Sequence, residues 1–156
     1  KGKSIGSEIE ARWIPNDRLE LYFNAGLLRA KIEQYSGPDT TLNDRSAAHA
    51  PAYTVSSGWE YRYPSGIFVM MSASATDEFY FDVNHNQKSK AFELMNARLG
   101  FEKDNWSIQL WGKNLTNKDF AVRGFYFGNE PPDFPNAIYT RRGDPRQVGL
   151  TFDMRF

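Results

Sequence analysis

The stretch from Asp82 to Glu93 carries the acidic and amide side chains that calcium-binding loops use. Asp82, Asn84 and Asn86 alternate, and Glu93 follows eleven residues after Asp82, which partly matches the calcium loop D-x-[DN]-x-[DN]-G-x5-E. The sixth position is Gln87, where that motif needs glycine, and the neighbouring sequence does not predict the flanking helices of such a loop. We therefore interpret the segment as a solvated loop and predict no metal site.

The remaining reactive residues do not form a recognisable catalytic motif. His49 and His85 are the only histidines, and neither has carboxylates at a spacing typical of a metal site. There is no cysteine, no G-x-S-x-G, no H-E-x-x-H and no phosphate-binding loop. Asn114 begins a sequence that matches the glycosylation sequon, which we interpret instead as a strand-end motif. The sequence predicts no catalytic residue, no cofactor and no enzymatic activity.

Composition excludes two further classes of protein. The 19 basic and 19 acidic residues are spread evenly, so no basic patch for nucleic acid is visible. No run approaches the 18 or more consecutive apolar residues of a membrane-spanning helix. Aromatic residues make up 15% of the chain, although the mean hydropathy is −0.62. This pairing is typical of strands in which polar and apolar residues alternate.

Alternation with a period of two is the dominant pattern, and it predicts extended strands rather than helices. Seven such segments can be drawn, at residues 4–14, 18–32, 53–63, 67–82, 91–102 and 106–115 and in the closing stretch 143–156. The breaks between them alternate in length. Tight turns are predicted at residues 15–17, 64–66 and 103–105, and loops at residues 34–51 and 83–90 and over some thirty residues after Leu115.

This order of breaks predicts an all-β, antiparallel up-and-down meander of about seven strands. Outer-membrane barrels have the same asymmetry, with short turns on the periplasmic side and long loops outside. If the three tight turns are periplasmic, the seventh strand must also end on that side.

Three groups of residues resemble motifs of one family. They are Asn96, Arg98, Leu99 and Gly100; Trp106, Trp111, Asn114, Leu115 and Thr116; and Gly143, Pro145, Arg146 and Phe156. Together they resemble the carboxy-terminal barrel segment of TonB-dependent outer-membrane receptors. The early stretch SIGSEIEARWIPNDRLELYFNAGLLRAKI also resembles a strand and hairpin of that family, so the likeness covers essentially the whole chain.

The resemblance implies a fold, a location and partners. Members are 22-stranded transmembrane β-barrels plugged by an amino-terminal domain, and they import siderophore-bound iron, cobalamin or sugars across the outer membrane of Gram-negative bacteria. Residues 1–156 would then be the last seven strands, cut from a longer protein whose plug, earlier strands and TonB-contacting segment are absent. We expect partners in the TonB system, through that absent region, in outer-membrane lipid and in a small-molecule ligand, siderophore-bound iron before cobalamin or carbohydrate.

The resemblance and the alternation together assign roles to three sets of residues. The barrel-assembly machinery would read the closing strand through Val148, Leu150, Phe152, Met154 and Phe156. Charged residues expected to face the lumen are Glu8, Glu10, Arg12, Glu60, Arg62 and Arg98. Aromatic ligand candidates in the predicted extracellular loops are Tyr35, Phe125, Tyr126, Phe127, Phe134 and Tyr139.

Simpler interpretations stay open for these sets. The charged residues can form a salt-bridged, hydrated wall, and the loop aromatics can pack against their own loops. Two alternatives to the receptor also remain. One is a soluble all-β sandwich or lectin-like module that binds a ligand or carbohydrate without transport. The other is a small complete barrel that acts as an adhesin or structural protein.

Overall fold

The computed structural model describes residues 1–36 and 41–156, and every regular element in it is a β-strand. The strands are β1 (Gly2–Asn16), β2 (Leu19–Ser36), β3 (Thr41–Ser46), β4 (Tyr53–Arg62), β5 (Ile67–Thr76), β6 (Phe79–Tyr80), β7 (Lys88–Ser89), β8 (Phe92–Lys103), β9 (Trp106–Lys113), β10 (Ala121–Gly128), β11 (Asn136–Arg142) and β12 (Gln147–Met154). Among these described residues, no helix is long and apolar enough to cross a membrane.

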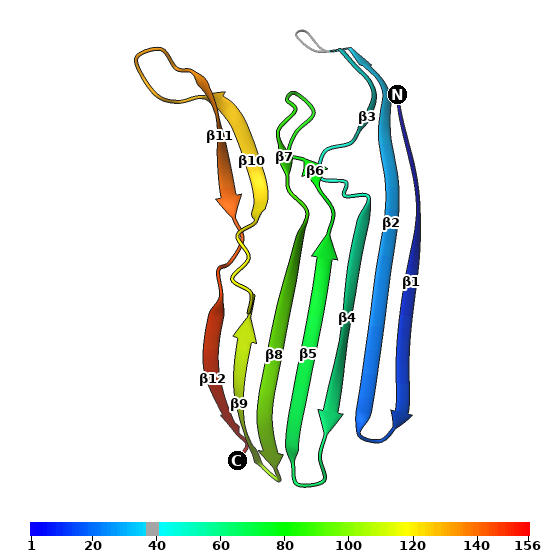
Figure 1. Ribbon diagram of the computed structural model, residues 1–156, viewed down its shortest axis with the longest axis vertical. Helices are drawn as coiled ribbons and strands as arrows, with labels where there is room; N and C mark the ends of the chain where they lie inside the picture. The colour runs from blue at the N-terminus through cyan, green and yellow to red at the C-terminus, as the bar shows by residue number, and fades with distance from the viewer. Residues whose placement is uncertain (37–40) are drawn as a thin grey trace.

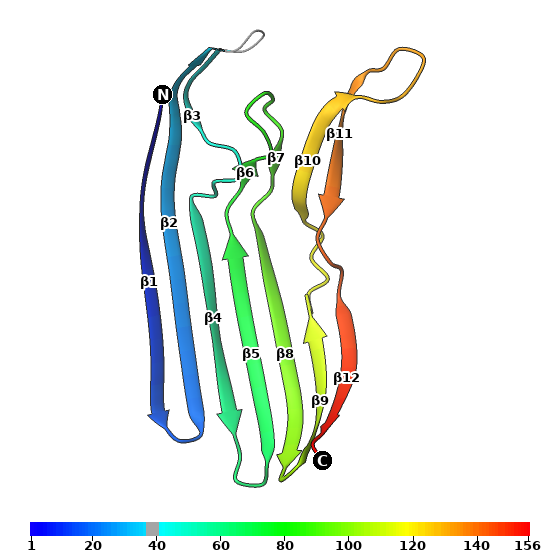
Figure 2. The ribbon, with the colours of Figure 1, turned by 180° about the vertical axis from the view of Figure 1, so that it is seen from behind.

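Seven long strands form one sheet in the order β1-β2-β4-β5-β8-β9-β12, each antiparallel to its neighbours. Strand β3 pairs with the far half of β2, while β6–β7 and β10–β11 form two small separate hairpins. Figures 1 and 2 show a tall, single-layered sheet with these extra strands at one end. The prediction of a seven-stranded up-and-down meander is confirmed.

Three tight turns join strands at one end of the sheet, which we call the turn end. The Asn16 Oδ1 accepts a hydrogen bond from the backbone N–H of Arg18 at 2.9 Å. Gly66 has a φ of 90°, which favours glycine, and its N–H donates to the carbonyl of Tyr63 at 3.0 Å. Asp104 has a φ of 43° in the third turn. The closing strand ends at the turn end (Figure 1), as parity requires.

The fourth predicted strand is shorter than expected, and the prediction of one continuous strand over residues 67–82 was wrong. Strand β5 ends at Thr76, and β6 resumes after two residues. The N–H of Asp77 donates to the carbonyl of Tyr53 at 3.1 Å, so the main sheet closes there. Phe79 and Tyr80 pair instead with Ser89 and Lys88. The apolar run therefore continues into a hairpin rather than into the sheet.

The three predicted loops also contain strands, at the opposite end that we call the loop end. Strand β3 lies within the stretch 34–51, of which residues 37–40 fall outside the described part, and it extends the β2 hairpin. Strand β7 lies within 83–90, and β10 and β11 lie within the region after Leu115. Backbone pairing explains all three, because an extended chain that rises beyond a sheet satisfies its peptide groups by folding back on itself.

The sheet has two chemically distinct faces and no core. Residues that pair directly across strands lie on one face, so the registers separate a polar face from an apolar face. Phe81, 4% exposed, is the one buried large apolar residue among those described. The accessible area is 11125 Å², against about 8,000 Å² for a compact monomer of this mass. The described strands form one open layer, with β1 and β12 at its two edges, and therefore neither a sandwich nor a closed small barrel.

Candidate functional site

The six residues predicted to face the lumen all lie on the polar face. Three alternate along β1 and two along β4, and the register places Glu60, Met70 and Arg98 side by side on β4, β5 and β8. The alternation of the sequence was thus sufficient to assign them to one face. That this face lines a lumen stays a prediction.

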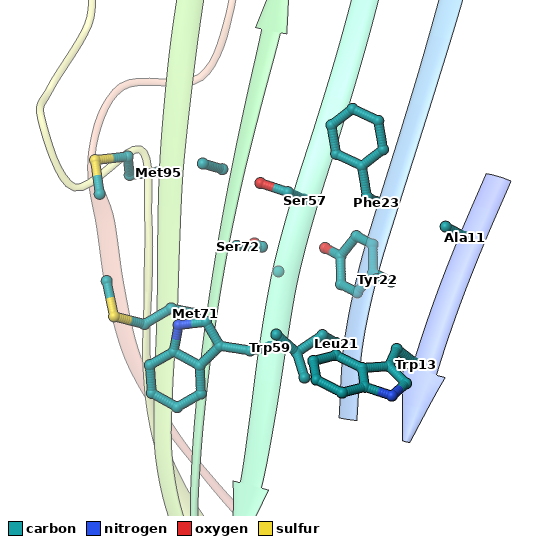
Figure 3. A pocket seen from close by; sticks show the side chains of 12 residues that line it. Ala11, Trp13, Leu21, Tyr22, Phe23, Ser57, Trp59, Met71, Ser72 and Met95 are labelled. Atoms are coloured by element: carbon teal, nitrogen blue, oxygen red, sulfur yellow. The ribbon is translucent and has the colours of Figure 1, made fainter. Parts of the chain in front are cut away.

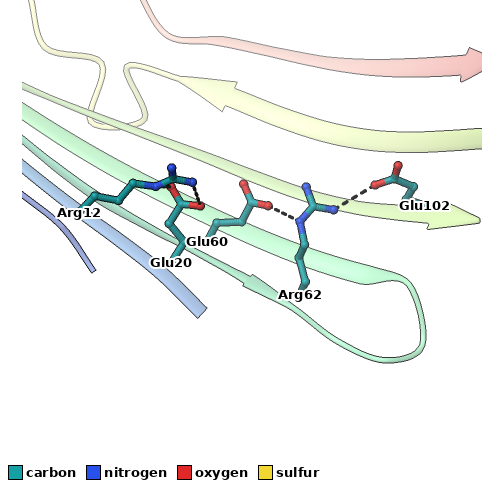
Figure 4. Close-up of polar contacts among 5 residues, drawn as sticks. All are labelled: Arg12, Glu20, Glu60, Arg62 and Glu102. Carbon is teal, nitrogen blue, oxygen red and sulfur yellow. Dashed lines mark hydrogen bonds and ion pairs between the residues drawn. The ribbon is translucent and has the colours of Figure 1, made fainter. Parts of the chain in front are cut away.

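A chain of ion pairs crosses the polar face near the turn end (Figure 4). The Arg12 guanidinium donates to both Glu20 oxygens, at 2.7 Å from Nε and 2.8 Å from Nη2. Arg62 contacts Glu60 at 2.5 Å and Glu102 at 3.0 Å. Glu20 and Glu60 are direct cross-strand neighbours, and each of these two carboxylates pairs with a different arginine, which offsets their mutual repulsion. Glu20 and Glu102 were missing from the predicted set, although the same alternation of even-numbered residues places them on the polar face.

Replacing Arg62 by alanine is expected to lower the stability of the sheet. The variant Arg62→Ala removes two ion pairs and leaves the Glu60 carboxylate unpaired beside Glu20. Exposed ion pairs contribute at most about 1 kcal/mol each, so we expect a loss of about 1 kcal/mol that shrinks in high salt. Urea unfolding at low and high salt measures it. Arg98→Ala is the matched control, because Arg98 makes no ion pair with a described residue. An equal loss in both variants would show that the ion-pair chain contributes nothing.

The asparagine of the family-like motif at residues 114–116 holds the loop end of β9 together. Asn114 is 4% exposed and has a φ of 47°. Its Nδ2 donates to the carbonyls of Lys118 (2.9 Å) and Asp144 (3.0 Å), and its Oδ1 accepts from the Lys118 N–H at 2.8 Å. Its own N–H donates to Asn96 Oδ1 at 3.0 Å. The amide is fully used inside the protein, in agreement with a strand-end role.

The other motif residues meet at the same joint. The N–H of Gly143 donates to the carbonyl of Phe120 at 2.9 Å, and the Phe120 ring lies so close that a Cβ at residue 143 would overlap it. The Arg146 N–H donates to Asn117 Oδ1 at 3.0 Å. These contacts connect the end of β9 to the start of β12. The motif therefore fixes where the β10–β11 hairpin leaves the sheet.

The six aromatic ligand candidates are not brought together. Tyr35 lies on β2, while β10 and β11 rise from the opposite side of the sheet (Figure 1). The other five lie on the β10–β11 hairpin and its connecting segment: Phe125, Tyr126, Phe127, Phe134 and Tyr139. Five of the six candidates therefore lie on one hairpin, and Tyr35 lies on a different strand.

The β10–β11 hairpin divides its aromatic residues between two faces. Phe125 pairs directly with Tyr139, and the rings of Phe127 and Tyr139 lie 5.1 Å apart, on one face. Tyr126 lies on the other face, with its ring 5.5 Å from that of His85. The alternation of a strand separates neighbours in sequence, so Phe125, Tyr126 and Phe127 do not act as one surface.

Two arginines, which the sequence analysis missed, share the face of Phe125. Arg123 and Arg141 are direct cross-strand neighbours, and the Arg123 guanidinium lies 5.4 Å from the Phe125 ring centre. Neither forms an ion pair with a described residue. The Tyr139 hydroxyl donates to Glu130 Oε1 at 3.4 Å. Burial is the larger cause and the Glu130 carboxylate the smaller one, and both raise the pKa of Tyr139. This face therefore offers aromatic rings, a neutral phenol and two positive charges.

Oxygen atoms of the calcium-like loop accept hydrogen bonds from the guanidinium of Arg45. The Arg45 Nη2 donates to the carbonyl of Asp82 at 3.0 Å and, in a shorter contact, to that of His85, while Nη1 donates to Asn86 Oδ1 at 3.1 Å. The guanidinium also lies 4.1 Å from the centre of the Tyr80 ring. Among the described residues, no three His, Asp or Glu side chains are grouped so as to hold a metal. The side chain of Arg45 therefore connects this loop to β3.

The apolar face is hollowed rather than flat (Figure 3). A depression of about 520 Å³ lies where small residues on neighbouring strands are framed by aromatic and methionine side chains. The small residues are Ala11, Ser57 and Ala73, and the frame includes Trp13, Phe23, Trp59, Met71 and Met95. The predicted assembly residues Val148, Leu150, Phe152 and Met154 lie on this same face, and Phe156 follows β12 fully exposed. Their role in assembly stays a prediction.

Comparison with known proteins identifies the fold. No family model matches the chain. The ferric yersiniabactin uptake receptor FyuA from Yersinia pestis superposes with a TM-score of 0.82 at 18% identity, over 99% of this chain and 24% of that structure. The siderophore receptor PiuA from Acinetobacter baumannii gives 0.80 at 15% identity, over 98% and 22%. The ferric-catecholate import receptor Fiu from E. coli K12, in its open form, gives 0.72 at 18% identity, over 99% and 21%.

The chain therefore has the fold of a segment of a siderophore-receptor barrel, and it spans less than a quarter of the length of these three receptor structures. The expected resemblance and the expected fold class are confirmed at this level. The matched structures are receptors for uptake or import, and their identity of 15–18% defines architecture rather than ligand.

Proposed function

We propose that the chain forms part of the barrel of a TonB-dependent outer-membrane receptor that imports a scarce ligand, siderophore-bound iron before cobalamin or carbohydrate. The observation that carries the proposal is a coreless single layer with one apolar and one polar face, superposable on receptor barrels over nearly its whole length. An exposed apolar face suits lipid, and a polar face suits a hydrated lumen. The protein has a transport role and no enzymatic one.

Within this proposal, the β10–β11 hairpin contributes to ligand binding through the face that carries Phe125 and Tyr139. Ferric complexes of catecholates combine aromatic rings with negative charge. Aromatic stacking and the paired Arg123 and Arg141 match both properties. Repulsion between two directly opposed arginines is relieved when an anion lies between them.

The test uses the complete protein, expressed in a strain without its own siderophore receptors. Uptake of radioactive iron as a ferric catecholate is expected, and uptake of cobalamin or a maltodextrin is not. Phe125→Ala is expected to weaken binding of the ferric catecholate about fivefold, because one lost aromatic contact costs about 1 kcal/mol. Tyr126→Ala, on the other face of the same hairpin, is the control and should bind normally. Uptake of none of the three ligands would contradict the proposal.

A further inference from the structure

A cluster of basic side chains lies on the apolar face at the loop end of β1, β2 and β3. Lys3 and Lys31 are direct cross-strand neighbours, and Arg29 pairs with Ile5 one step closer to the middle of the sheet. Together with Asp44 and with Glu33, whose carboxylate pairs with Lys1 at 3.2 Å, they line a hollow of about 370 Å³. We call Lys3, Arg29, Lys31 and Asp44 the basic rim.

The basic rim carries more positive than negative charge. Lys31 Nζ donates to Asp44 Oδ1 at 2.8 Å, and this hydrogen bond, with the charges of Lys31 and Arg29, lowers the pKa of Asp44. The carboxylate is therefore ionised at neutral pH and holds Lys31 in place. Lys3 and Arg29 form no ion pair with a described residue. Within the described part of the chain, two like charges therefore lie without a counter-ion beside a third.

The surface directly next to the basic rim is apolar. Ile5, Ile9 and Leu27 lie on the same face and are 63%, 61% and 56% exposed. Between this point and the turn end, the described strands β1 and β2 carry no charged side chain on the apolar face, whether after Ile5 on β1 or before Leu27 on β2. A positive cluster at the border of an apolar surface matches an amphiphile with an anionic head and hydrocarbon chains.

We propose that the basic rim binds the phosphate group of a lipid in the leaflet on the loop side of the membrane. The lipid's hydrocarbon chains lie along Ile5, Ile9 and Leu27. Lys3 and Arg29 contact the phosphate oxygens, since these are the basic groups of the rim that form no ion pair with a described residue, and Asp44 orients Lys31 toward the same position. The inference rests on the proposed function, because it requires the apolar face to lie in lipid.

The test measures binding of diphosphorylated lipid A to the complete, purified protein in neutral detergent. The double variant Lys3→Gln/Arg29→Gln is expected to bind it about thirtyfold more weakly, because each basic group near a lipid surface contributes about fivefold. Lys103→Gln removes one charge from the same face at the turn end and is expected to bind normally. All three side chains are exposed, so both variants should fold.

Two further ligands separate the sources of binding. Lipid A without its phosphates is expected to bind wild type about as weakly as diphosphorylated lipid A binds the double variant. Inorganic phosphate is expected to compete poorly, because it lacks the hydrocarbon chains. Unchanged binding in the double variant, equal loss in Lys103→Gln, or full displacement by inorganic phosphate would overturn the proposal. Uptake of the ferric catecholate is expected to be normal in the double variant, so failure here is distinguishable from failure of the proposed function.

Discussion

The variant Met71→Arg is expected to lose about 2–4 kcal/mol of stability, or to fail to assemble, when the complete protein is studied in lipid bilayers. Met71 lies on the apolar face in the middle of β5 and lines the depression between neighbouring strands. In the proposed function the apolar face meets lipid, so a guanidinium placed there would face hydrocarbon, and arginine at the middle of a lipid-facing barrel surface costs this amount. Urea unfolding in vesicles measures the loss directly.

The neighbouring residue provides a control of the same type and at the same depth. Met70 lies on the polar face beside Glu60 and Arg98, and both methionines are half-buried. Met70→Arg places the new charge between a carboxylate and a guanidinium on the face that the proposal makes hydrated, so we expect a change below about 1 kcal/mol. Equal losses in the two variants would mean that the two faces meet similar surroundings. The assignment of lipid to the apolar face would then be wrong.

The faces of the sheet could be predicted from the sequence because strand geometry leaves no choice. Once residues 4–14 and 53–63 are taken as strands, alternation alone places Glu8 with Glu10 and Glu60 with Arg62. The three tight turns were equally visible, because Pro-Asn-Asp, Pro-Ser-Gly and Lys-Asp-Asn interrupt the alternation. Both signals are local. They required no knowledge of which strands pair.

The loop end could not be predicted, because its structure depends on contacts between distant segments. The Arg45 guanidinium reaches backbone carbonyls of residues about forty positions away, and no spacing rule shows that contact. Residues 125–127 are three consecutive aromatic candidates in the sequence, and the pleat of β10 divides them between two faces. Arg123 and Arg141 were missed for the same reason, since only the register makes them neighbours.

The variant Asn114→Ala is expected to lose about 3–4 kcal/mol of stability and to loosen the base of the β10–β11 hairpin. It removes three side-chain hydrogen bonds at a buried position, each contributing about 1 kcal/mol. It also places alanine at a φ of 47°, a left-handed conformation that costs about 1 kcal/mol more. Urea unfolding gives the total, and hydrogen exchange of β10 and β11 reports the loosening.

Asn114→Gly separates the two contributions, because glycine adopts the left-handed conformation without strain but makes no side-chain hydrogen bonds. It is expected to be more stable than Asn114→Ala by about 1 kcal/mol and equally loosened in hydrogen exchange. A loss below about 1 kcal/mol in both variants would show that the amide does not hold the joint. If the Asn114 amide does hold this joint in the wild type, we expect ligand affinity to fall in both variants, because the hairpin is then no longer fixed above the sheet. This effect would arise although residue 114 does not itself carry the proposed binding face of Phe125.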